Sequence, residues 1–268
     1  MKQAAPRRKY SISAVNRAVA VIDTVASGNG QTLFEVARGA SLDEATTLRY
    51  LSSLCDHGYV FRDERNASYH LGLRLYQLGQ QAIGLRDVRK VALPFMERLL
   101  ERFEETVNLA HARGDSIVII DVLESRRSIR RGATVGEPDL WHASALGKAI
   151  LAAAGVEDAW RVLTGVERPR YTTRTLVGID ELLDDLAEVR QRGYAIDDEE
   201  YEDGLRCVAA AINDRRGRPV YAVSISGVAG RMPPAVTEEM GEAVLEVAEA
   251  ISEELGYVPV KQEEEVGG

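Results

Sequence analysis

A run of polar side chains between residues 43 and 53 has the types and the spacing that recognition of DNA bases requires. Leu48, Leu51 and Cys55 recur at helical spacing and mark the expected inner face of a short helix. The side chains expected on its outer face are Asp43, Thr46, Arg49, Tyr50 and Ser53. Hydroxyl, phenol and guanidinium groups on such a helix can contact base edges in the major groove. An ordinary amphipathic helix with a solvated face fits the same pattern.

Two short helices joined by a tight turn would position this face. Thr32 precedes Glu35 by three residues, and Ser41 precedes Glu44 by three, so each pair matches a capping box at a helix start. Gly39 lies between them and permits the turn. The sequence therefore predicts a helix-turn-helix motif.

The segments on both sides of this motif complete a small domain. Ile12, Val15, Val19, Ile22 and Val25 predict a preceding amphipathic helix that buries this face. After the motif, residues 59–62 and 69–72 read as two strands around a charged turn.

Such a hairpin forms a wing, in which Arg62, Arg65 and His70 could touch phosphates. His70 fits a strand-face role better than a ligand role. Arg7, Arg8 and Lys9 could also reach phosphate, although a solubilising tail fits them equally well.

Composition and charge are compatible with a DNA-binding module attached to a separate acidic body. The 268-residue chain has a net charge of −9. Residues 1–85 carry ten Lys/Arg and seven Asp/Glu, so their net charge is +3. The net charge of residues 86–268 is therefore −12. No apolar run is long enough to span a membrane or to form a signal peptide. With only Cys55 and Cys207, a disulfide framework is not expected, and a reducing cytoplasm is the expected location.

The longer C-terminal part predicts an α+β domain with an antiparallel sheet. Expected strands cover residues 107–112, 117–123, 207–213 and 220–226, and expected helices cover residues 87–103, 144–153, 180–192 and 237–255. Strands and helices do not alternate strictly, which argues against a parallel sheet. Pro94 is expected to kink the first of these helices, and the acidic tail after residue 260 is expected to be frayed.

Catalytic and metal chemistry find little support in the sequence. Four histidines occur outside any recognisable catalytic motif, and Cys207 in GLRCVAA has no visible activating partner. Two cysteines and scattered histidines offer no spacing for a metal site. We therefore expect no enzyme, no cofactor and no metal, with a Cys207-dependent hydrolase as a remote alternative.

Several segments together resemble the IclR-type transcriptional regulators, from about Ser11 to Gly256. In the N-terminal part these are SISAVNRAVAVIDTVA, TTLRYLSSLCDHGYV and YHLG. In the C-terminal part they are HASALGKAILAA, VRQRGYAIDDEEYEDGLRCVAAAI and YAVSISG. The resemblance implies a winged helix-turn-helix domain (residues 1–72), a linker helix (73–86) and a GAF-like effector-binding domain (87–260). It also implies a homodimer or dimer of dimers, an operator in double-stranded DNA, and a small carboxylic acid as effector.

The same resemblance assigns an effector pocket. Its residues are Ser144, Ala145, Leu146, Gly147, Asp197, Cys207, Ser224 and Ser226. Their chemistry suits an anion, because serines two apart on one strand share a face and helix amides favour negative charge. Three alternatives are that the serines face solvent, that Cys207 is a small buried hydrophobe, and that Asp197 caps a helix.

Two departures from the family pattern refine the predicted DNA contacts and the predicted class of effector. Glu44 and Ala45 stand where small basic and hydroxylic residues are usual, so Glu44 is expected to cap the helix. The DNA contacts are then expected from Thr46, Thr47, Arg49, Tyr50, Ser53 and Arg62. Leu146 replaces a smaller residue and, with Trp141 and His142, suggests an apolar wall for an aromatic acid such as a hydroxybenzoate.

The expected function is a ligand-responsive repressor. The alternatives are an activator that responds to a small keto acid, such as pyruvate or glyoxylate, and a dimerisation adaptor with a degenerate DNA-binding head. The operator sequence stays open.

Overall fold

The computed structural model describes residues 12–81 and 85–258 of the chain, which divides into two compact units, residues 1–83 and 84–268. The division falls inside the segment 73–86, where the sequence places a linker. The phosphate contacts expected of Arg7, Arg8 and Lys9, and the tail after residue 260, lie outside the described residues. No helix in the described part of the chain is long and apolar enough to cross a membrane.

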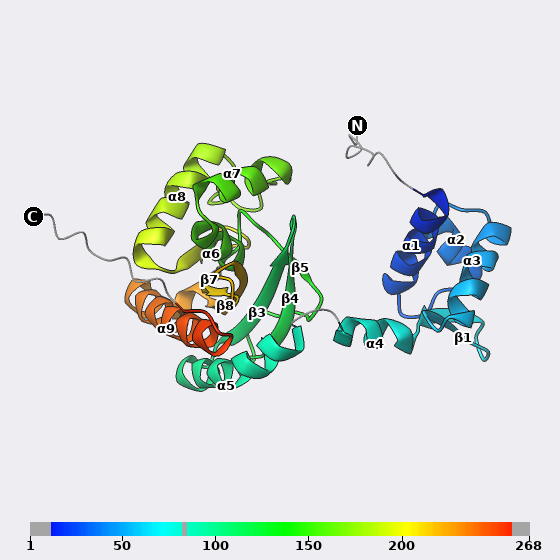
Figure 1. The fold of residues 1–268 in the computed structure, drawn as a ribbon, viewed down its shortest axis with the longest axis horizontal. Helices are drawn as coiled ribbons and strands as arrows, with labels where there is room; N and C mark the ends of the chain where they lie inside the picture. The colour runs from blue at the N-terminus through cyan, green and yellow to red at the C-terminus, as the bar shows by residue number, and fades with distance from the viewer. Residues whose placement is uncertain (1–11, 82–84, 259–268) are drawn as a thin grey trace, which may run out of the picture. The chain divides into compact units, whose positions relative to one another are not determined.

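The first unit is a winged helix-turn-helix, as the sequence predicts (Figure 1). Its elements are α1 (Ser13–Ala26), α2 (Leu33–Gly39), α3 (Glu44–Asp56), β1 (Val60–Asp63), β2 (Ser68–Leu71) and α4 (Leu73–Gln81). β1 and β2 pair antiparallel and form the wing. The buried core consists of Val21, Val25, Val36, Leu51, Val60 and Tyr69.

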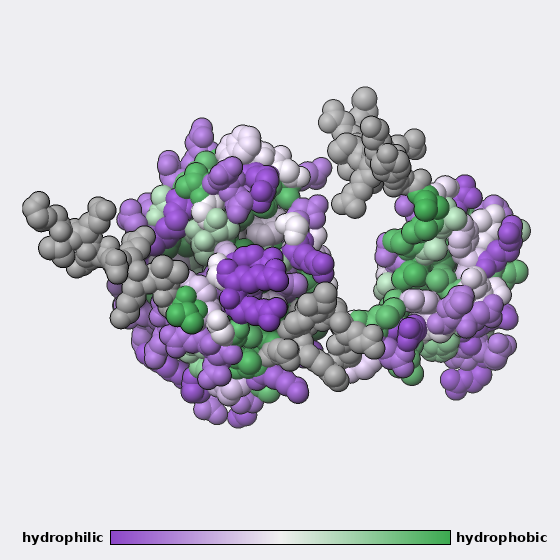
Figure 2. All heavy atoms as spheres, in the orientation of Figure 1, coloured by the Kyte–Doolittle hydropathy of each residue, from purple (hydrophilic) through white to green (hydrophobic). Residues whose placement is uncertain are grey.

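The apolar face predicted for the first helix matches the buried face of α1 only at its C-terminal end. Val25 enters the core and Ile22 is half-buried, as predicted. Val21 is also buried, whereas Ile12, Val15 and Val19 are 69%, 55% and 49% exposed. The apolar residues of α1 spread beyond a single stripe, so periodicity did not select between two overlapping faces. Figure 2 shows hydrophobic surface along α1.

The second unit is an α+β domain built on one antiparallel sheet of order β5-β4-β3-β8-β7-β6. Its strands are β3 (Thr106–Arg113), β4 (Ser116–Leu123), β5 (Pro138–Asp139), β6 (Ala195–Asp198), β7 (Leu205–Asn213) and β8 (Pro219–Val228). Its helices are α5 (Leu85–Phe103), α6 (Ala145–Ala154), α7 (Val156–Gly165), α8 (Ile179–Arg192) and α9 (Pro234–Glu254), with a 3-10 turn at Ala229–Arg231. The sequence missed β5, β6 and α7. Pro94 lies inside α5.

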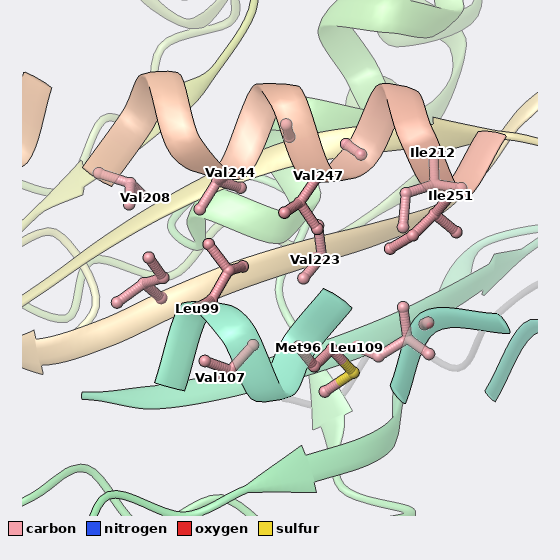
Figure 3. Close-up of a cluster of buried hydrophobic side chains, with 14 of the residues drawn as sticks. Met96, Leu99, Val107, Leu109, Val208, Ile212, Val223, Val244, Val247 and Ile251 are labelled. Atoms are coloured by element: carbon pink, nitrogen blue, oxygen red, sulfur yellow. The ribbon is translucent and has the colours of Figure 1, made fainter. Parts of the chain in front are cut away.

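Helices cover both faces of this sheet. α5 and α9 pack on one face over a core of large aliphatic side chains, among them Met96, Leu109, Val223, Val247 and Ile251 (Figure 3). α6, α7 and α8 cover the other face (Figure 1).

The second face is lined by small residues beneath α6. They include Ala110, Ala195, Ala209 and Ala222, all 0% exposed. Alanines allow a helix to approach a sheet closely. Along the strands this alanine floor gives way to polar residues, and the candidate effector site lies there.

Candidate DNA-binding and effector-binding sites

The exposed face of α3 differs from the predicted face by about one residue. Arg49 and Ser53 are exposed as expected, and Thr46 is half-buried. Leu48, expected in the core, is 48% exposed, and Ala45 and Ser52 are exposed beside it. The surface that α3 offers to a partner therefore combines Arg49 and two serines with small apolar groups.

Two side chains predicted to meet DNA belong to the interior. Thr47 is 0% exposed and its hydroxyl donates to the Asp43 carbonyl at 2.9 Å, so the prediction that Thr47 contacts DNA is wrong. Tyr50 is half-buried and packs against the core of the first unit. The sequence pattern counts threonine and tyrosine as polar. Their methyl and ring atoms can nevertheless pack in a core as leucine does.

The capping prediction is right for α2 and wrong for α3. At α2, Glu35 N donates to Thr32 Oγ1 at 3.4 Å and Thr32 N donates to Glu35 Oε2 at 2.8 Å, a complete capping box. At α3 the N-cap is Asp43, whose Oδ1 accepts from Thr46 N at 2.8 Å. Glu44 is the first helical residue and caps nothing, although an acid in the first turn still suits the helix dipole.

Ser41 belongs to the turn rather than to a cap. It adopts the left-handed conformation with φ 55°, and Leu42 N donates to Ala37 O at 3.0 Å, which closes α2. Gly39 is the last residue of α2 and has another role. A Cβ atom there would lie 2.4 Å from Thr24 Cγ2, so this glycine allows α1 and α2 to approach each other.

In the wing, the exposed guanidinium of Arg62 is available to contact DNA. Arg62 is exposed, with its guanidinium 5.9 Å from the centre of the Tyr69 ring. Arg65 pairs with Asp63 at 3.3 Å, and the pKa of Asp63 is lowered by hydrogen bonds from Arg65. His70 bonds to Ser68 Oγ at 2.8 Å and stacks on Phe61, so it has the structural role that the sequence favours.

Polar residues of the second unit form a row across four neighbouring strands. Asp197 of β6 lies opposite Cys207 of β7, Cys207 opposite Ser226 of β8, and Ser226 opposite Thr106 of β3. In the next row, Ser224 lies between Ala209 and Asn108. We call these two rows the polar floor. The strand register alone brings together four of the predicted effector residues.

Both serines of the polar floor face the protein interior. Ser224 and Ser226 are each 1% exposed, so the alternative of a solvent-facing pair is wrong. Asn108 Nδ2 donates to Ser224 Oγ at 3.2 Å and to Ser226 Oγ at 3.1 Å. The Ser224 hydrogen therefore stays available for another acceptor, whereas the Ser226 hydroxyl also interacts with the Cys207 sulfur.

Burial raises the pKa of two further residues of the polar floor, Cys207 and Asp197. Burial, together with the nearby Asp197, raises the pKa of the Cys207 thiol to about 12, so the thiol stays protonated and is a poor nucleophile. Burial also raises the pKa of Asp197 to about 6, although hydrogen bonds from the amides of Glu200 and Tyr201 oppose this rise. The Asp197 carboxylate caps the turn that follows β6 rather than a helix.

The start of α6 supplies backbone groups rather than side chains. Ser144 is the N-cap: its Oγ accepts from Gly147 N at 3.0 Å and donates to Leu140 O at 2.7 Å, so the hydroxyl is fully used. A Cβ at Gly147 would lie 2.1 Å from Leu140 O, so this glycine is required for close packing. The amides of Ala145 and Leu146 have no acceptor within the helix and suit an anion.

A buried charged cluster connects α6 to the polar floor. Lys148 of α6 is 1% exposed and its Nζ contacts Glu200 Oε1 at 2.5 Å and Asp185 Oδ2 of α8 at 3.2 Å. Burial alone would lower the pKa of Lys148, but the two carboxylates outweigh it and raise that pKa. The charged Lys148 also lowers the pKa of Asp197.

The segment between β4 and α6 supplies a cation that sequence reasoning missed. Arg131 is half-buried, lies 5.5 Å over the Tyr201 ring, and lowers the pKa of both Asp197 and Cys207. Thr106 Oγ1 donates to the Arg131 carbonyl at 3.2 Å and fixes this segment to β3. No motif marked Arg131, because the chain between residues 124 and 143 has no regular spacing.

The apolar wall expected from Trp141 and His142 has a different composition. Trp141 Nε1 donates to Asp115 O at 2.8 Å, at the other end of β3 from the polar floor, so Trp141 packs in the core and the prediction for it is wrong. Leu146 is buried in the same core. His142 lies 6.2 Å from Tyr171, whose ring lies 5.3 Å from that of Tyr201. These three rings form an aromatic cluster next to Arg131.

Comparison with known proteins assigns each unit to a described family. Residues 14–64 match the profile of the IclR helix-turn-helix domain, and residues 80–253 match that of the bacterial transcriptional regulator IclR C-terminal domain. The chain is 35% identical to the HTH-type transcriptional repressor AllR of Salmonella paratyphi A, across 96% of this chain and 95% of that protein. It is 34% identical to the HTH-type transcriptional regulator BhcR of Paracoccus denitrificans, across 93% and 89%.

A solved structure also resembles this fold. The crystal structure of an IclR homologue from Microbacterium hydrocarbonoxydans, complexed with 4-hydroxybenzoate, superposes with a TM-score of 0.80 at 27% identity. The match covers 91% of this chain and 99% of the homologue.

Proposed function

Because this chain belongs to the IclR family of bacterial transcriptional regulators, we propose that it is a repressor whose DNA binding responds to a small carboxylic acid. The observation that carries the proposal is the polar floor: two buried serine hydroxyls, each accepting a hydrogen bond from Asn108, beside a half-buried arginine. That arrangement suits a carboxylate. The matching families and relatives are transcriptional regulators, so the chain is a regulator and not an enzyme.

The DNA contacts follow from the exposed face of α3. Arg49 and Ser53 can donate to bases or phosphates, Thr46 can contribute at the edge, and Leu48 offers an apolar contact to a thymine methyl group. Arg62 would hold the wing against a phosphate. Tyr50 remains a candidate only through its hydroxyl, because its ring packs inward.

The carboxylate would lie between the polar floor and the start of α6. Two groups of donors would bind it: the hydroxyls of Ser224 and Ser226 from the sheet, and the backbone amides of Ala145 and Leu146 from α6. The positive charge of Arg131 would balance the negative charge of the carboxylate. Asp197 accommodates an anion only when it is protonated, which its raised pKa permits at mildly acidic pH. Cys207 fills the floor as a small buried group.

An aromatic acid such as a hydroxybenzoate is our preferred effector class. The aromatic cluster of His142, Tyr171 and Tyr201 provides ring surfaces for stacking, and the 4-hydroxybenzoate complex of a homologue supports the same class. A small keto acid such as pyruvate or glyoxylate, acting on an activator, is the second candidate. A keto acid would accept hydrogen bonds from the same serine hydroxyls but would not stack on the aromatic cluster.

Calorimetric titration of the full chain with 4-hydroxybenzoate and with pyruvate tests the effector class. Binding of the aromatic acid supports the proposal. Pyruvate binding without an aromatic signal would favour the keto acid. A reporter fused to the operator, measured with and without effector, gives the sign of regulation: effector should raise expression from a repressed operator.

Matched serine variants test the position of the site. Ser224→Ala removes one charge-assisted hydrogen bond and should weaken effector binding by roughly 1–2 kcal/mol. Ser252→Ala is the control, because Ser252 is also buried but bonds to α9 and β7 on the other side of the sheet. Equal losses in both variants would place the effector elsewhere.

We also propose that the chain works as a homodimer or a dimer of dimers. The exposed apolar side chains at and just before α1 support an association between copies, because Ile12, Val15 and Val19 are not covered by any of the described residues of the first unit. Sedimentation of the wild type and of Val15→Lys measures this. A monomeric wild type would contradict it.

A further inference from the structure

Asn108 is a buried amide whose hydrogen bonds are only half satisfied. It lies in β3 directly opposite Ser224 of β8 and is 0% exposed. Its nitrogen donates to both serine hydroxyls, at 3.2 and 3.1 Å. Its carbonyl oxygen, at the other end of the amide, is buried and has no hydrogen-bond partner among the described residues.

A buried acceptor without a partner indicates that a donor from outside the described residues completes its hydrogen bonding. Buried side-chain oxygens in folded proteins nearly always accept a hydrogen bond. The nearest polar neighbour on the same strand face, Thr106, is already committed: its hydroxyl donates to Arg131 O and accepts from Ser125 N. The polar floor therefore presents two kinds of group to a ligand: hydroxyl donors at the serines, of which Ser226 also contacts Cys207, and an acceptor at Asn108 that is unpartnered among the described residues.

The spacing of these groups restricts the ligand further. The nitrogen and oxygen of one amide are bonded to the same carbon, so the acceptor lies close to the serines that the nitrogen contacts. A ligand whose carboxylate takes the serine hydrogens must then carry its own donor close to that carboxylate. A hydroxyl on the adjacent carbon meets this requirement, whereas a hydroxyl across an aromatic ring lies much farther away.

We propose that Asn108 contacts the effector through its amide oxygen and selects a 2-hydroxy carboxylic acid, with Ser224 and Ser226 donating to the carboxylate. This inference rests on the proposed function, since it assumes that the effector binds at the polar floor. It changes the preferred ligand from an aromatic acid in general to one with a hydroxyl next to the carboxylate. Asn108 thereby becomes a specificity-determining residue.

Calorimetry on the wild-type chain with matched acids tests the proposal. The pairs are mandelate against phenylacetate and lactate against propionate, which differ only in the 2-hydroxyl, with 4-hydroxybenzoate as the positional control. We expect the hydroxy acid of at least one pair to bind about tenfold more tightly than its partner. Equal affinities within both pairs would overturn the role of Asn108 while leaving a carboxylate site intact. Absence of binding by every acid would overturn the proposed function as well.

A variant at Asn108 identifies the residue responsible. Asn108→Leu keeps the volume but removes both polar groups, so the affinity ratio within the pair should fall to about one. A ratio unchanged in this variant would show that another acceptor, such as Asp197, binds the hydroxyl. Should Asn108→Leu not fold, Asn108→Ser provides the same comparison, since its shorter side chain cannot reach the ligand hydroxyl and the ratio should again collapse.

Discussion

At the scale of single residues, burial determines what the site can do. Cys207 and Asp197 lie opposite each other on neighbouring strands, and both have raised pKa values because they are buried. A protonated thiol is inert, whereas a carboxyl group with a pKa of about 6 titrates near neutrality. We therefore expect protonation of Asp197 to couple effector binding to pH.

Effector affinity should fall as the pH rises through about 6. An anionic effector repels ionised Asp197, so binding favours the protonated form, which is present below this pH and lost above it. The fall should approach roughly tenfold per pH unit where one proton is taken up. Calorimetry between pH 5.5 and 8 measures it, with an acid that stays ionised throughout. Asp197→Asn should flatten the profile, and an affinity that rises with pH would contradict this account.

At the scale of elements, two helices depend on polar contacts that the sequence suggested only in part. α3 begins with the Asp43 cap, and α6 is held to α8 by the buried Lys148 cluster. Each contact can be removed separately by substitution.

Asp43→Ala should destabilise the chain measurably through loss of the N-cap, whose Oδ1 accepts from Thr46 N. Glu44→Ala should cost much less, because Glu44 caps nothing. Urea unfolding of the two variants compares them. A larger loss for Glu44→Ala would restore the capping box expected from the sequence.

Lys148→Met should destabilise the second unit by about 3–5 kcal/mol, because the buried Glu200 and the half-buried Asp185 would lose their cation. The double variant Lys148→Met with Glu200→Gln should recover part of this loss, since one buried charge is removed. Chemical denaturation followed by circular dichroism measures both. A loss below about 1 kcal/mol in the single variant would mean that water solvates the cluster.

The sequence predicted the elements more reliably than their orientation. Periodicity located α1 and α3 but misjudged their buried faces, because Thr47 and Tyr50 pack like apolar residues and Leu48 does not. A motif identified the serines of β8, and only the strand register shows that Asn108 lies opposite Ser224. Arg131 and Asn108 escaped prediction because tertiary pairing, rather than local spacing, brings them to the site.

At the scale of the whole molecule, two units carry separable functions. The DNA-facing residues belong to residues 1–83 and the polar floor to residues 84–268. A substitution in one unit should therefore leave the intrinsic binding of the other unchanged.

Arg49→Ala should weaken operator binding by roughly 1–3 kcal/mol while effector affinity stays the same. Arg216→Ala is the control, because it removes the same charge from an exposed turn of the second unit. Mobility-shift titration on the DNA upstream of the gene measures both. Wild-type binding should also weaken steeply with added salt. Equal losses from the two variants would indicate a purely nonspecific charge effect.

The polar floor has a mechanical consequence. Its side chains come from four strands that are hydrogen-bonded to one another, so their spacing is fixed by the sheet and changes little when a ligand arrives. We therefore expect motion on ligand binding in the segment that carries Arg131 and in the first turn of α6. Hydrogen–deuterium exchange should slow in those two places on ligand addition and stay constant in β7 and β8. On this proposal the sheet holds the site rigid, and the segment that carries Arg131 transmits the signal.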